Sequence, residues 1–137
     1  MNISSRCEYA CRAMVELGRH ENNELPVTAE YIADRRHIPE KYLVHILLQL
    51  KRAGLVRSVR GSQGGYLLAR QPEKINMHDI VQAIDGPVLH PLPVKDNQGK
   101  DLEPAWREVA FGIGQLLDKL TLRALIDRAS KSNMYYI

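Results

Sequence analysis

The segment between residues 39 and 70 constrains the fold of this 137-residue chain more than any other part of it. After Pro39 the apolar residues recur at helical spacing until Gly54, so we expect a helix that begins near the proline and ends at the glycine. Two extended runs follow at 55–60 and 66–70, and a glycine-rich turn at 61–65 separates them, which is the pattern of a β-hairpin. A helix followed at once by such a hairpin indicates a winged helix, and hence a mainly α protein with a small β-hairpin.

Two further helices are predicted before this segment. Apolar residues mark one helical face from Ser5 to His20, and Thr28 is a suitable N-cap for a second helix that ends near Arg36. Because a tight connection joins the second helix to the third, the pair has the pattern of a helix-turn-helix. In the third helix we expect one face to be buried, formed by Tyr42, Leu43, Ile46, Leu47, Leu50 and Ala53, and the opposite face to be exposed, formed by Lys41, Val44, His45, Leu48 and Arg52.

In the C-terminal half, the sequence predicts a long helix whose apolar side chains must be buried against another helix. Asn76 and Asp79 form a capping-box pattern at the start of a fourth helix, and Gly86 ends it. Periodicity is then absent until 104, where a long helix begins. Because its apolar residues lie outside the winged-helix core, we expect the helix to pair with the same helix of a second copy, which makes a homodimer. These residues follow alternating steps of three and four, as in a coiled-coil seam, and are Trp106, Val109, Ile113, Leu116 and Leu120.

These elements divide the chain into three parts. We expect a winged helix-turn-helix domain at 1–86, a loop at 87–103, and a C-terminal part at 104–137. The last part contains the dimerisation helix and, after an N-cap at Thr121, a short final helix. The loop is longer than most connections in compact domains, and loops of that length usually carry a function.

The charge of the chain is unevenly distributed. Its formal net charge is +3, but residues 35–70 contain eight basic residues and one acidic residue, which gives this window +7 and leaves −4 for the rest. A basic block in an otherwise acidic protein is typical of a protein that binds a polyanion, most often nucleic acid, although a solvated basic surface has the same charge. Arg57 and Arg60 are expected near the hairpin tip, where glycines let the backbone approach a phosphate chain or a minor groove.

Composition and motifs exclude several other classes of protein. No run of about 20 apolar residues is present, so no membrane span is expected, and the absence of a secretory signal predicts a cytoplasmic protein. We find no nucleophile elbow, phosphate-binding loop or dinucleotide fingerprint, so no enzyme is expected. The five histidines are dispersed, and Cys7 and Cys11 are two thiols that do not complete a metal site, so we expect both to be small buried hydrophobes. The sequence therefore predicts no catalytic residue, no metal and no cofactor.

A set of residues spread over nearly the whole chain also matches a known pattern, most specifically in the hairpin. These residues are Ser4-Ser5-Arg6, Tyr9-Ala10, Ala13-Met14, Ile38, Tyr42-Leu43, Leu50, Gly54-Leu55-Val56, Ser58-Val59-Arg60-Gly61, Gly64-Gly65-Tyr66-Leu67-Leu68, Ile80-Val81, Trp106 and Leu120-Thr121-Leu122. Together they resemble the Rrf2 (Rrf-two) family of bacterial winged-helix transcription regulators. Members of that family include iron–sulfur cluster regulators, a nitric-oxide sensor and a regulator of cysteine metabolism.

The resemblance implies a sequence-specific DNA-binding regulator, expected to be a repressor, that reads a palindromic operator in double-stranded DNA as a homodimer. The third helix would enter the major groove, the wing would reach the minor groove, and the long helix would pair two subunits. By position, Ser5 and Arg6 would contact phosphates. The full set of expected DNA-binding residues is Ser5, Arg6, Pro39, Lys41, Tyr42, His45, Arg52, Arg57, Arg60, Gly61, Ser62, Gln63, Gly64 and Gly65.

The chain departs from the family pattern in the loop before the long helix. Cluster-binding members carry three cysteines there, whereas residues 86–104 contain none, which excludes a cluster held by thiolates at those positions. Oxygen and nitrogen ligands for a different metal remain at Glu8, His90, Asp96, Asp101 and Glu103.

Three interpretations stay open. The first, which we favour, is a DNA-binding regulator without a cysteine-ligated cluster, whose signal is a small molecule, a protein effector or chemistry at Cys7 and Cys11. The second is a regulator that binds a metal or cluster through other ligands. The third is a winged-helix adaptor that regulates an enzyme by protein contact, which would not require a charge of +7 on the helix and wing.

Overall fold

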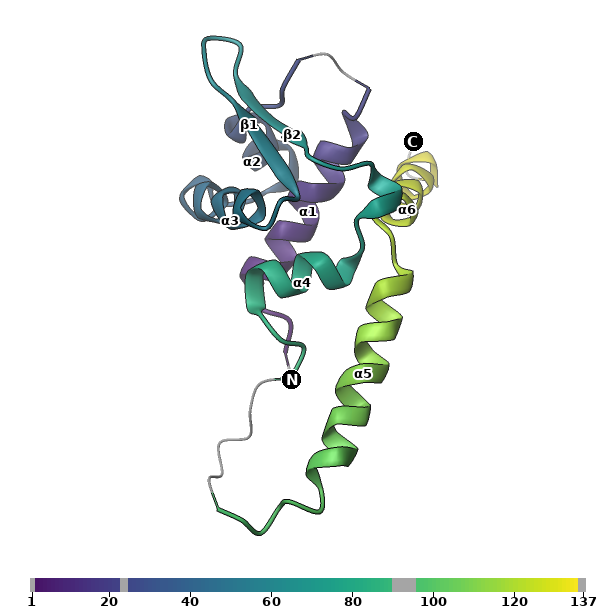
Figure 1. The fold of residues 1–137 in the computed structure, drawn as a ribbon. Helices are drawn as coiled ribbons and strands as arrows, with labels where there is room; N and C mark the ends of the chain where they lie inside the picture. Colours follow the sequence, from purple (N-terminus) through teal and green to yellow (C-terminus); the bar gives the residue numbers. More distant parts are fainter. Residues whose placement is uncertain (1, 23–24, 90–95, 136–137) are drawn as a thin grey trace.

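The structure, a computed structural model, describes residues 2–22, 25–89 and 96–135 and confirms a mainly α fold with a two-stranded hairpin. Figure 1 shows a body of packed helices from which one long helix extends as an arm. The elements are α1 (Ser5–Arg19), α2 (Ala29–Arg36), α3 (Glu40–Arg52), β1 (Val56–Val59), β2 (Gly65–Leu68), a short 3₁₀ helix η1 (Pro72–Lys74), α4 (Met77–Asp85), α5 (Glu103–Lys119) and α6 (Leu122–Tyr135).

Helix α1 lies at the centre of the body and packs against α2, α3, α4 and α6. Its side chains Ala13 and Met14 are fully buried, as are Ile46 and Leu47 of α3. Complete burial of an aliphatic side chain of this size contributes about 1.5–3 kcal/mol. The core therefore depends on the inward faces of α1 and α3, and the opposite face of α3 is left to solvent.

Helix α6 is longer than the short final helix predicted from the sequence, with 14 residues. Leu122 and Ile126 are buried in the same core as α1, although the predicted division placed this helix in the C-terminal part with the arm. Gly18 permits the contact, because a Cβ at that position would lie 2.3 Å from Cδ1 of Ile126. The first and the last helix of the described chain thus pack against each other.

The helix starts follow the expected capping chemistry. The Thr28 hydroxyl accepts the backbone N–H of Tyr31, and the Thr121 hydroxyl accepts that of Ala124. Asn76 and Asp79 form the complete capping box, with each side chain accepting the backbone N–H of the other residue. These caps satisfy N–H groups that have no partner within the helix.

Two predictions for α3 are wrong in detail. The buried stripe contains Leu43, Ile46, Leu47 and Leu50, but Tyr42 and Ala53 are exposed. Each residue turns a helix by about 100°, so both residues fall beyond the edge of the stripe. The start of the helix is as predicted, since Pro39 is the N-cap residue and Glu40 the first helical residue.

The hairpin is anchored to the body by a backbone bridge. Strands β1 and β2 are antiparallel, with Val59 opposite Gly65, so Gly65 belongs to a strand and not to the turn as predicted. Tyr66 and Val27 exchange two backbone hydrogen bonds of 2.7 and 3.0 Å. Gly65 allows this approach, since a Cβ there would lie 2.5 Å from the carbonyl oxygen of Val27. The wing is therefore held in a defined position beside α1.

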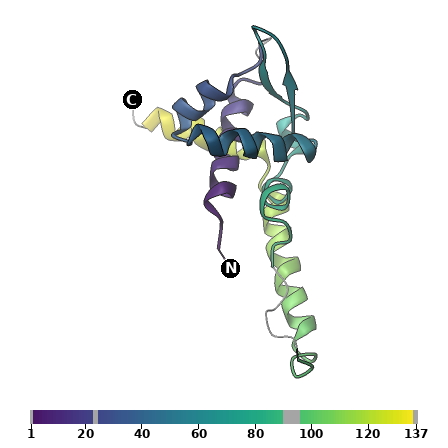
Figure 2. The same ribbon diagram turned by 90° about the vertical axis from the view of Figure 1, so that its left-hand side faces the viewer.

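The arm touches the body mainly through α4. The Asp118 carboxylate accepts a hydrogen bond of 2.8 Å from Nδ1 of His78, and the same imidazole ring packs against Gly114. At the end of the arm, the backbone N–H of Met77 donates to Leu120 O and that of Leu122 donates to Ile75 O. Figure 2 shows the arm pointing away from the body, with α3 crossing the body and the hairpin at the end opposite the arm. Within the described residues, no helix is long and apolar enough to cross a membrane.

Candidate nucleic-acid interface

The outward face of α3 carries the side chains predicted for the major groove. Lys41, Tyr42, Val44, His45, Leu48 and Arg52 are all exposed. Helices α2 and α3 meet across the short connection that ends at Pro39, which is exposed as well. The helix is thus presented by α1 and α2 in the way that a recognition helix requires.

The start of α1 lies next to this face. Ser5 and Arg6 are exposed, and the Arg6 guanidinium donates a hydrogen bond to the side-chain oxygen of Gln49 on α3. The Ser4 hydroxyl caps α1 by accepting a hydrogen bond from the backbone N–H of Cys7. The same hydroxyl donates a hydrogen bond of 2.6 Å to the Asp85 carboxylate of α4. The predicted phosphate-contacting residues therefore lie beside α3, and Gln49 joins them.

The tip of the wing contains Arg60 and the turn residues 61–64. Arg60, Gly61, Ser62 and Gln63 are exposed, and the N–H of Gly64 closes the turn on Gly61 O at 3.0 Å. A Cβ at Gly64 would lie 2.2 Å from Val59 O, so the turn accepts no side chain at that position. The tip consequently presents backbone, the Arg60 guanidinium and the polar side chains of Ser62 and Gln63.

Arg57 does not lie near the tip as predicted. It pairs with Leu67, two residue pairs away from the end of the hairpin, and it lines a shallow cavity of about 530 Å³ between α1, β2 and η1. The sequence prediction overlooked the strand length, because the hairpin has four residue pairs before its turn begins.

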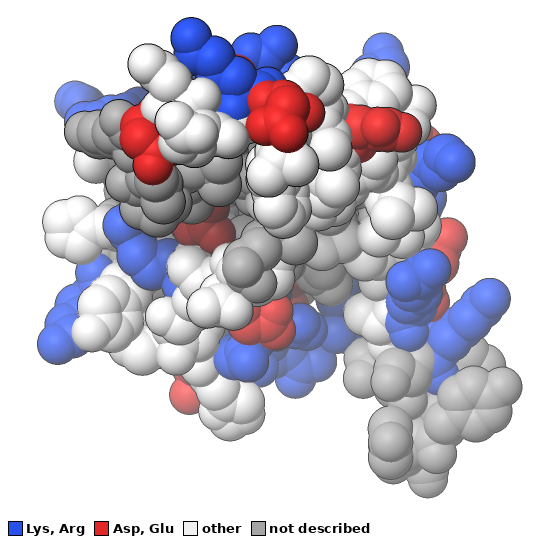
Figure 3. Space-filling model, turned by 90° about the horizontal axis from the view of Figure 1, so that it is seen from below, with Lys and Arg blue, Asp and Glu red and all other residues white. Residues whose placement is uncertain are grey.

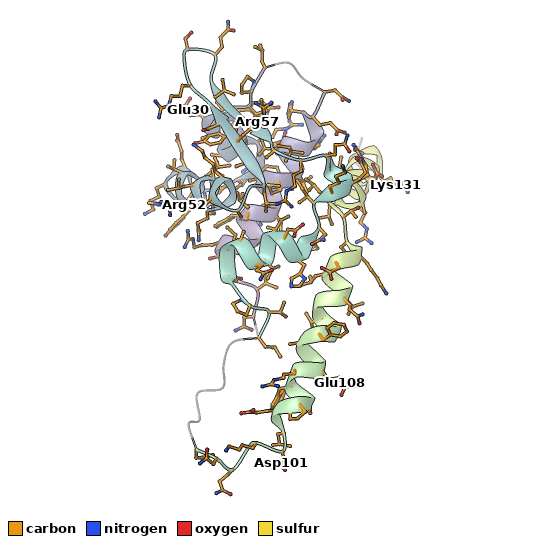
Figure 4. The ribbon with its side chains drawn as sticks, in the orientation of Figure 1. Glu30, Arg52, Arg57, Asp101, Glu108 and Lys131 are labelled. Atoms are coloured by element: carbon orange, nitrogen blue, oxygen red, sulfur yellow. The ribbon has the colours of Figure 1, made fainter. Side chains whose placement is uncertain are left out.

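Cations of the 35–70 window lie on α3 and the hairpin, away from the arm tip (Figure 4). Figure 4 shows Arg52 at the end of α3 and Arg57 on the hairpin, while Asp101 and Glu108 lie far away on the arm. In Figure 3, Lys and Arg side chains and uncharged side chains occupy the left-hand edge, the side on which α3 lies in Figure 1. Of the +7 block, Lys41, Lys51 and Arg52 are exposed on α3 and Arg60 is exposed on the wing, whereas Arg57 and Arg70 line the cavity beside α1. Exposed cations of this kind attract the phosphates of nucleic acid.

The predicted seam of the arm is largely exposed. Trp106 is 49% exposed, Val109 45% and Leu116 65%, whereas Ile113 and Leu120 are partly buried. The sequence analysis missed two further exposed residues of this region, Leu102 and Phe111. Leu102 lies four residues before Trp106 and so continues the seam, but it precedes position 104, where the helix was expected to begin, whereas Phe111 does not follow the alternating steps of three and four. Gln49 was also missed, and its signal was its position one turn after His45 on α3.

Within the part of the chain that the structure describes, the side chains do not assemble a site for an iron–sulfur cluster or another metal ion. Of the residues that the structure describes, no three His, Cys, Asp or Glu side chains meet in a group that could hold a metal ion, and His90 lies outside those residues. Cys7 is buried and Cys11 is half-buried. The Cys11 thiol lowers the pKa of Cys7 by hydrogen bonding to it, and the same contact raises the pKa of Cys11. Two thiols on one helix cannot complete the four-ligand set of a cluster.

The fold and the interface together define the class of protein. A helix-turn-helix with an exposed basic third helix and a glycine-rich wing is the arrangement of a winged-helix transcription regulator. A family model named Rrf2, described as an iron-dependent transcriptional regulator, matches residues 3–128. The chain belongs to the Rrf2 family.

Similar protein sequences belong to the same class of transcription regulators. The chain is similar to the HTH-type transcriptional regulator CymR of Bacillus subtilis, with 31% identity over 140 residues that cover 100% of both chains. It is also similar to the HTH-type transcriptional regulator IscR of Erwinia tasmaniensis, with 31% identity over 136 residues, 93% of this chain and 79% of the relative.

Solved structures give the same result. The structure of CymR, the global cysteine regulator of B. subtilis, matches with a TM-score of 0.79 and 30% identity over 93% of this chain and 98% of that one. A structure of IscR from T. potens matches with a TM-score of 0.77 and 33% identity over 99% and 97%. The chain is therefore a DNA-binding transcription regulator and not an enzyme.

Proposed function

We propose that this protein is a homodimeric repressor that binds a palindromic operator and works without a cysteine-ligated cluster. The observation that carries the proposal is the shared surface of α3, the start of α1 and the wing, in which exposed cations frame the outward face of one helix. Occupation of an operator by such a protein blocks access to a promoter, which makes repression the simplest outcome.

Each part of this surface has a different task. His45 has ring nitrogens that donate to or accept from a base edge in the major groove, whereas Arg6, Lys41 and Arg60 position the protein on phosphates. The glycines of the wing tip let the backbone approach the minor groove. The remaining predicted residues, Ser5, Pro39, Tyr42, Arg52, Ser62 and Gln63, are exposed around these contacts.

The arm supports the homodimer. Trp106, Val109 and Leu116 lie on one side of α5, while the Gly114 side contacts α4, so the exposed apolar side has no partner among the described residues of the chain. Pairing of two arms would bury this surface and place two α3 helices about one DNA turn apart, roughly 34 Å. A two-fold dimer of this kind requires a palindromic site.

The cluster-free state is supported by the chemistry of the loop. The segment 86–104 has no cysteine, and the two cysteines of the chain lie on α1. The signal that controls the regulator then acts through a small molecule, a protein effector or the α1 thiols. An absorption spectrum of the anaerobically purified protein tests this point, and a bound iron–sulfur chromophore would contradict it.

The main experiment selects genomic fragments with the purified full-length protein and measures their affinity over a range of salt concentrations. We expect one palindromic motif, a stoichiometry of one dimer per site, and a log–log salt slope that steepens by about −0.9 for each neutralised phosphate. A flat salt dependence would contradict the electrostatic interface. Failure to bind any DNA, together with specific capture of one enzyme, would instead support a protein-interaction adaptor.

A further inference from the structure

The outward face of α3 exposes aliphatic side chains at its centre. Val44 is 49% exposed and Leu48 is 42% exposed. They lie one helical turn apart, so their side chains are neighbours on the same face. Single exposed apolar residues are ordinary on protein surfaces, but a neighbouring pair on the face that a recognition helix turns to DNA calls for a contact.

Cations and a histidine surround this pair. Lys41 and Arg52 lie one turn before Val44 and one turn after Leu48 on the outward face, and His45 lies between them. The one acidic residue of this helix, Glu40, stands at its first position, one turn before Val44 and two turns before Leu48. The surface therefore has aliphatic side chains with cations on both sides of them. Such a surface is complementary to a polyanion that exposes apolar groups between its phosphates.

Tyr42 is a weaker candidate for the same contact. The ammonium group of Lys41 lies 5.2 Å from the centroid of its ring, so one side of the ring is engaged by a cation. The ring also lies on the opposite flank of the outward face from Val44, since two residues separate them by about 200° on a helix. Val44 and Leu48 are thus the aliphatic side chains that are free to make a new contact.

The major groove of DNA offers one apolar group, the C5 methyl group of thymine. Valine and leucine carry no donor or acceptor, so they cannot distinguish the other base edges by hydrogen bonding. We propose that Val44 and Leu48 read thymine methyl groups, and that each operator half-site therefore holds thymine at the positions these side chains face. The inference rests on the proposed function, because it requires α3 to enter the major groove.

Replacement of thymine by uracil tests the inference, because it removes the methyl group and leaves every hydrogen-bonding group of the base in place. The full-length protein first selects its site from a random duplex pool. Each thymine of that site is then replaced singly by deoxyuridine, and fluorescence anisotropy gives the Kd. We expect about a fourfold rise in Kd, the effect of one buried methyl group, at one or two positions of each half-site and no change elsewhere.

Two variants assign the effect to its residues. For Val44→Ala and Leu48→Ala, the ratio of Kd for the uracil and thymine duplexes should fall from about four to about one at the position that each residue faces. Leu25→Ala is the matched control, since Leu25 is a 60% exposed leucine outside α3, and it should keep the wild-type ratio. All three side chains are exposed, so the variants should fold, which a thermal unfolding curve checks.

The outcomes separate the inference from the proposed function. If the protein selects a palindromic site but no uracil exchange changes Kd, the proposed function stands and methyl reading is wrong. If both alanine variants keep the wild-type sensitivity to uracil, methyl reading by these two residues is also wrong. If no site is selected at all, the proposed function fails and the inference fails with it.

Discussion

Helices α3 and α5 both expose apolar side chains, but the charges around them differ. On α3, Val44 and Leu48 lie between Lys41 and Arg52, and the one acid of this helix, Glu40, lies a turn before Val44. On α5 the charges have both signs, as in the ion pair of 3.9 Å between Arg107 and Glu103. Cations around an apolar patch favour the binding of DNA, because they attract its phosphates. Charges of both signs give no net attraction to phosphate and are compatible with contact to a second protein chain. Apolar exposure thus marks an interface, and the surrounding charge indicates its partner.

The largest effect is expected from charges placed on the arm. In the double variant Trp106→Glu with Leu116→Glu, two carboxylates would meet their copies across the seam, so we expect a monomer in sedimentation velocity. Operator affinity should fall by about 100-fold or more, because the second half-site no longer adds to binding. Gln115→Glu places a charge on the opposite side of α5 and should remain dimeric. A double variant that stays dimeric would show that the arms do not pair along this seam.

A second test acts on the wing, which together with α3 forms the proposed DNA-binding surface. In Gly65→Ala the added Cβ would meet Val27 O at 2.5 Å, which forces β2 away from the body. We expect a loss of about 1–3 kcal/mol in the free energy of unfolding, measured by urea denaturation, and weaker operator binding. Gly99→Ala is the control, because no atom lies within 4 Å of its Cβ position. Equal stability of the two variants would mean that the bridge to Val27 does not hold the wing.

A third test separates positioning from base reading within the same surface. Arg60→Ala should weaken binding to all sequences and reduce the salt slope by about 1, since one phosphate contact is lost. His45→Ala should leave nonspecific binding almost unchanged but reduce discrimination against a mismatched site by about 1–3 kcal/mol. Both are measured by anisotropy with specific and scrambled duplexes, with Arg128→Ala on α6 as the charge control. If the two variants behaved alike, helix and wing would not have separate tasks.

The smallest effect is expected at a contact that belongs to neither face. The Arg123 guanidinium lies 2.6 Å from Glu73 and 2.5 Å from Glu21, and its hydrogen bond lowers the pKa of Glu73 below the ordinary 4.5. A carboxylate with a lowered pKa stabilises the fold above its unfolded-state pKa, and this contribution is lost as the pH falls through the lower folded-state value.

Glu73→Gln should therefore reduce Tm slightly at neutral pH, and the gap to the wild type should close in acid. The effect stays small because the carboxylate is exposed to water. Operator affinity and dimerisation should not change. A gap in Tm that is independent of pH would assign the effect to packing and not to charge.

The sequence predicted the local structure well where a few neighbouring residues decide it. The caps at Thr28, Asn76 and Thr121 depend on one side chain and the next turn, and all three are confirmed. The inward face of α3 was correct at its centre and wrong at its edges, since Tyr42 is exposed. Periodicity locates the middle of a buried stripe, but the packing partners determine its width.

Long-range packing could not be predicted in the same way. The contact of α6 with α1 depends on Gly18 and Ile126, which are more than a hundred residues apart, and no local pattern links them. The hydrogen bond between Arg6 and Gln49 has the same character. For the site, residue types and their helix face were predictable, whereas the place of Arg57 required the strand register.

The backbone junction between the arm and the body has a consequence for the spacing of the operator. Leu120 and Leu122, on the two sides of the α5–α6 turn, are hydrogen-bonded to Met77 and Ile75 at the start of α4, so the arm leaves the body in one direction. In a dimer paired through the arms, the distance between the two α3 helices would then be fixed by the protein. Inserting one base pair between the half-sites moves them apart by about 3.4 Å and rotates one half-site around the duplex axis. A dimer with a fixed separation of its α3 helices would not adjust to this change, so its affinity for the longer operator should fall.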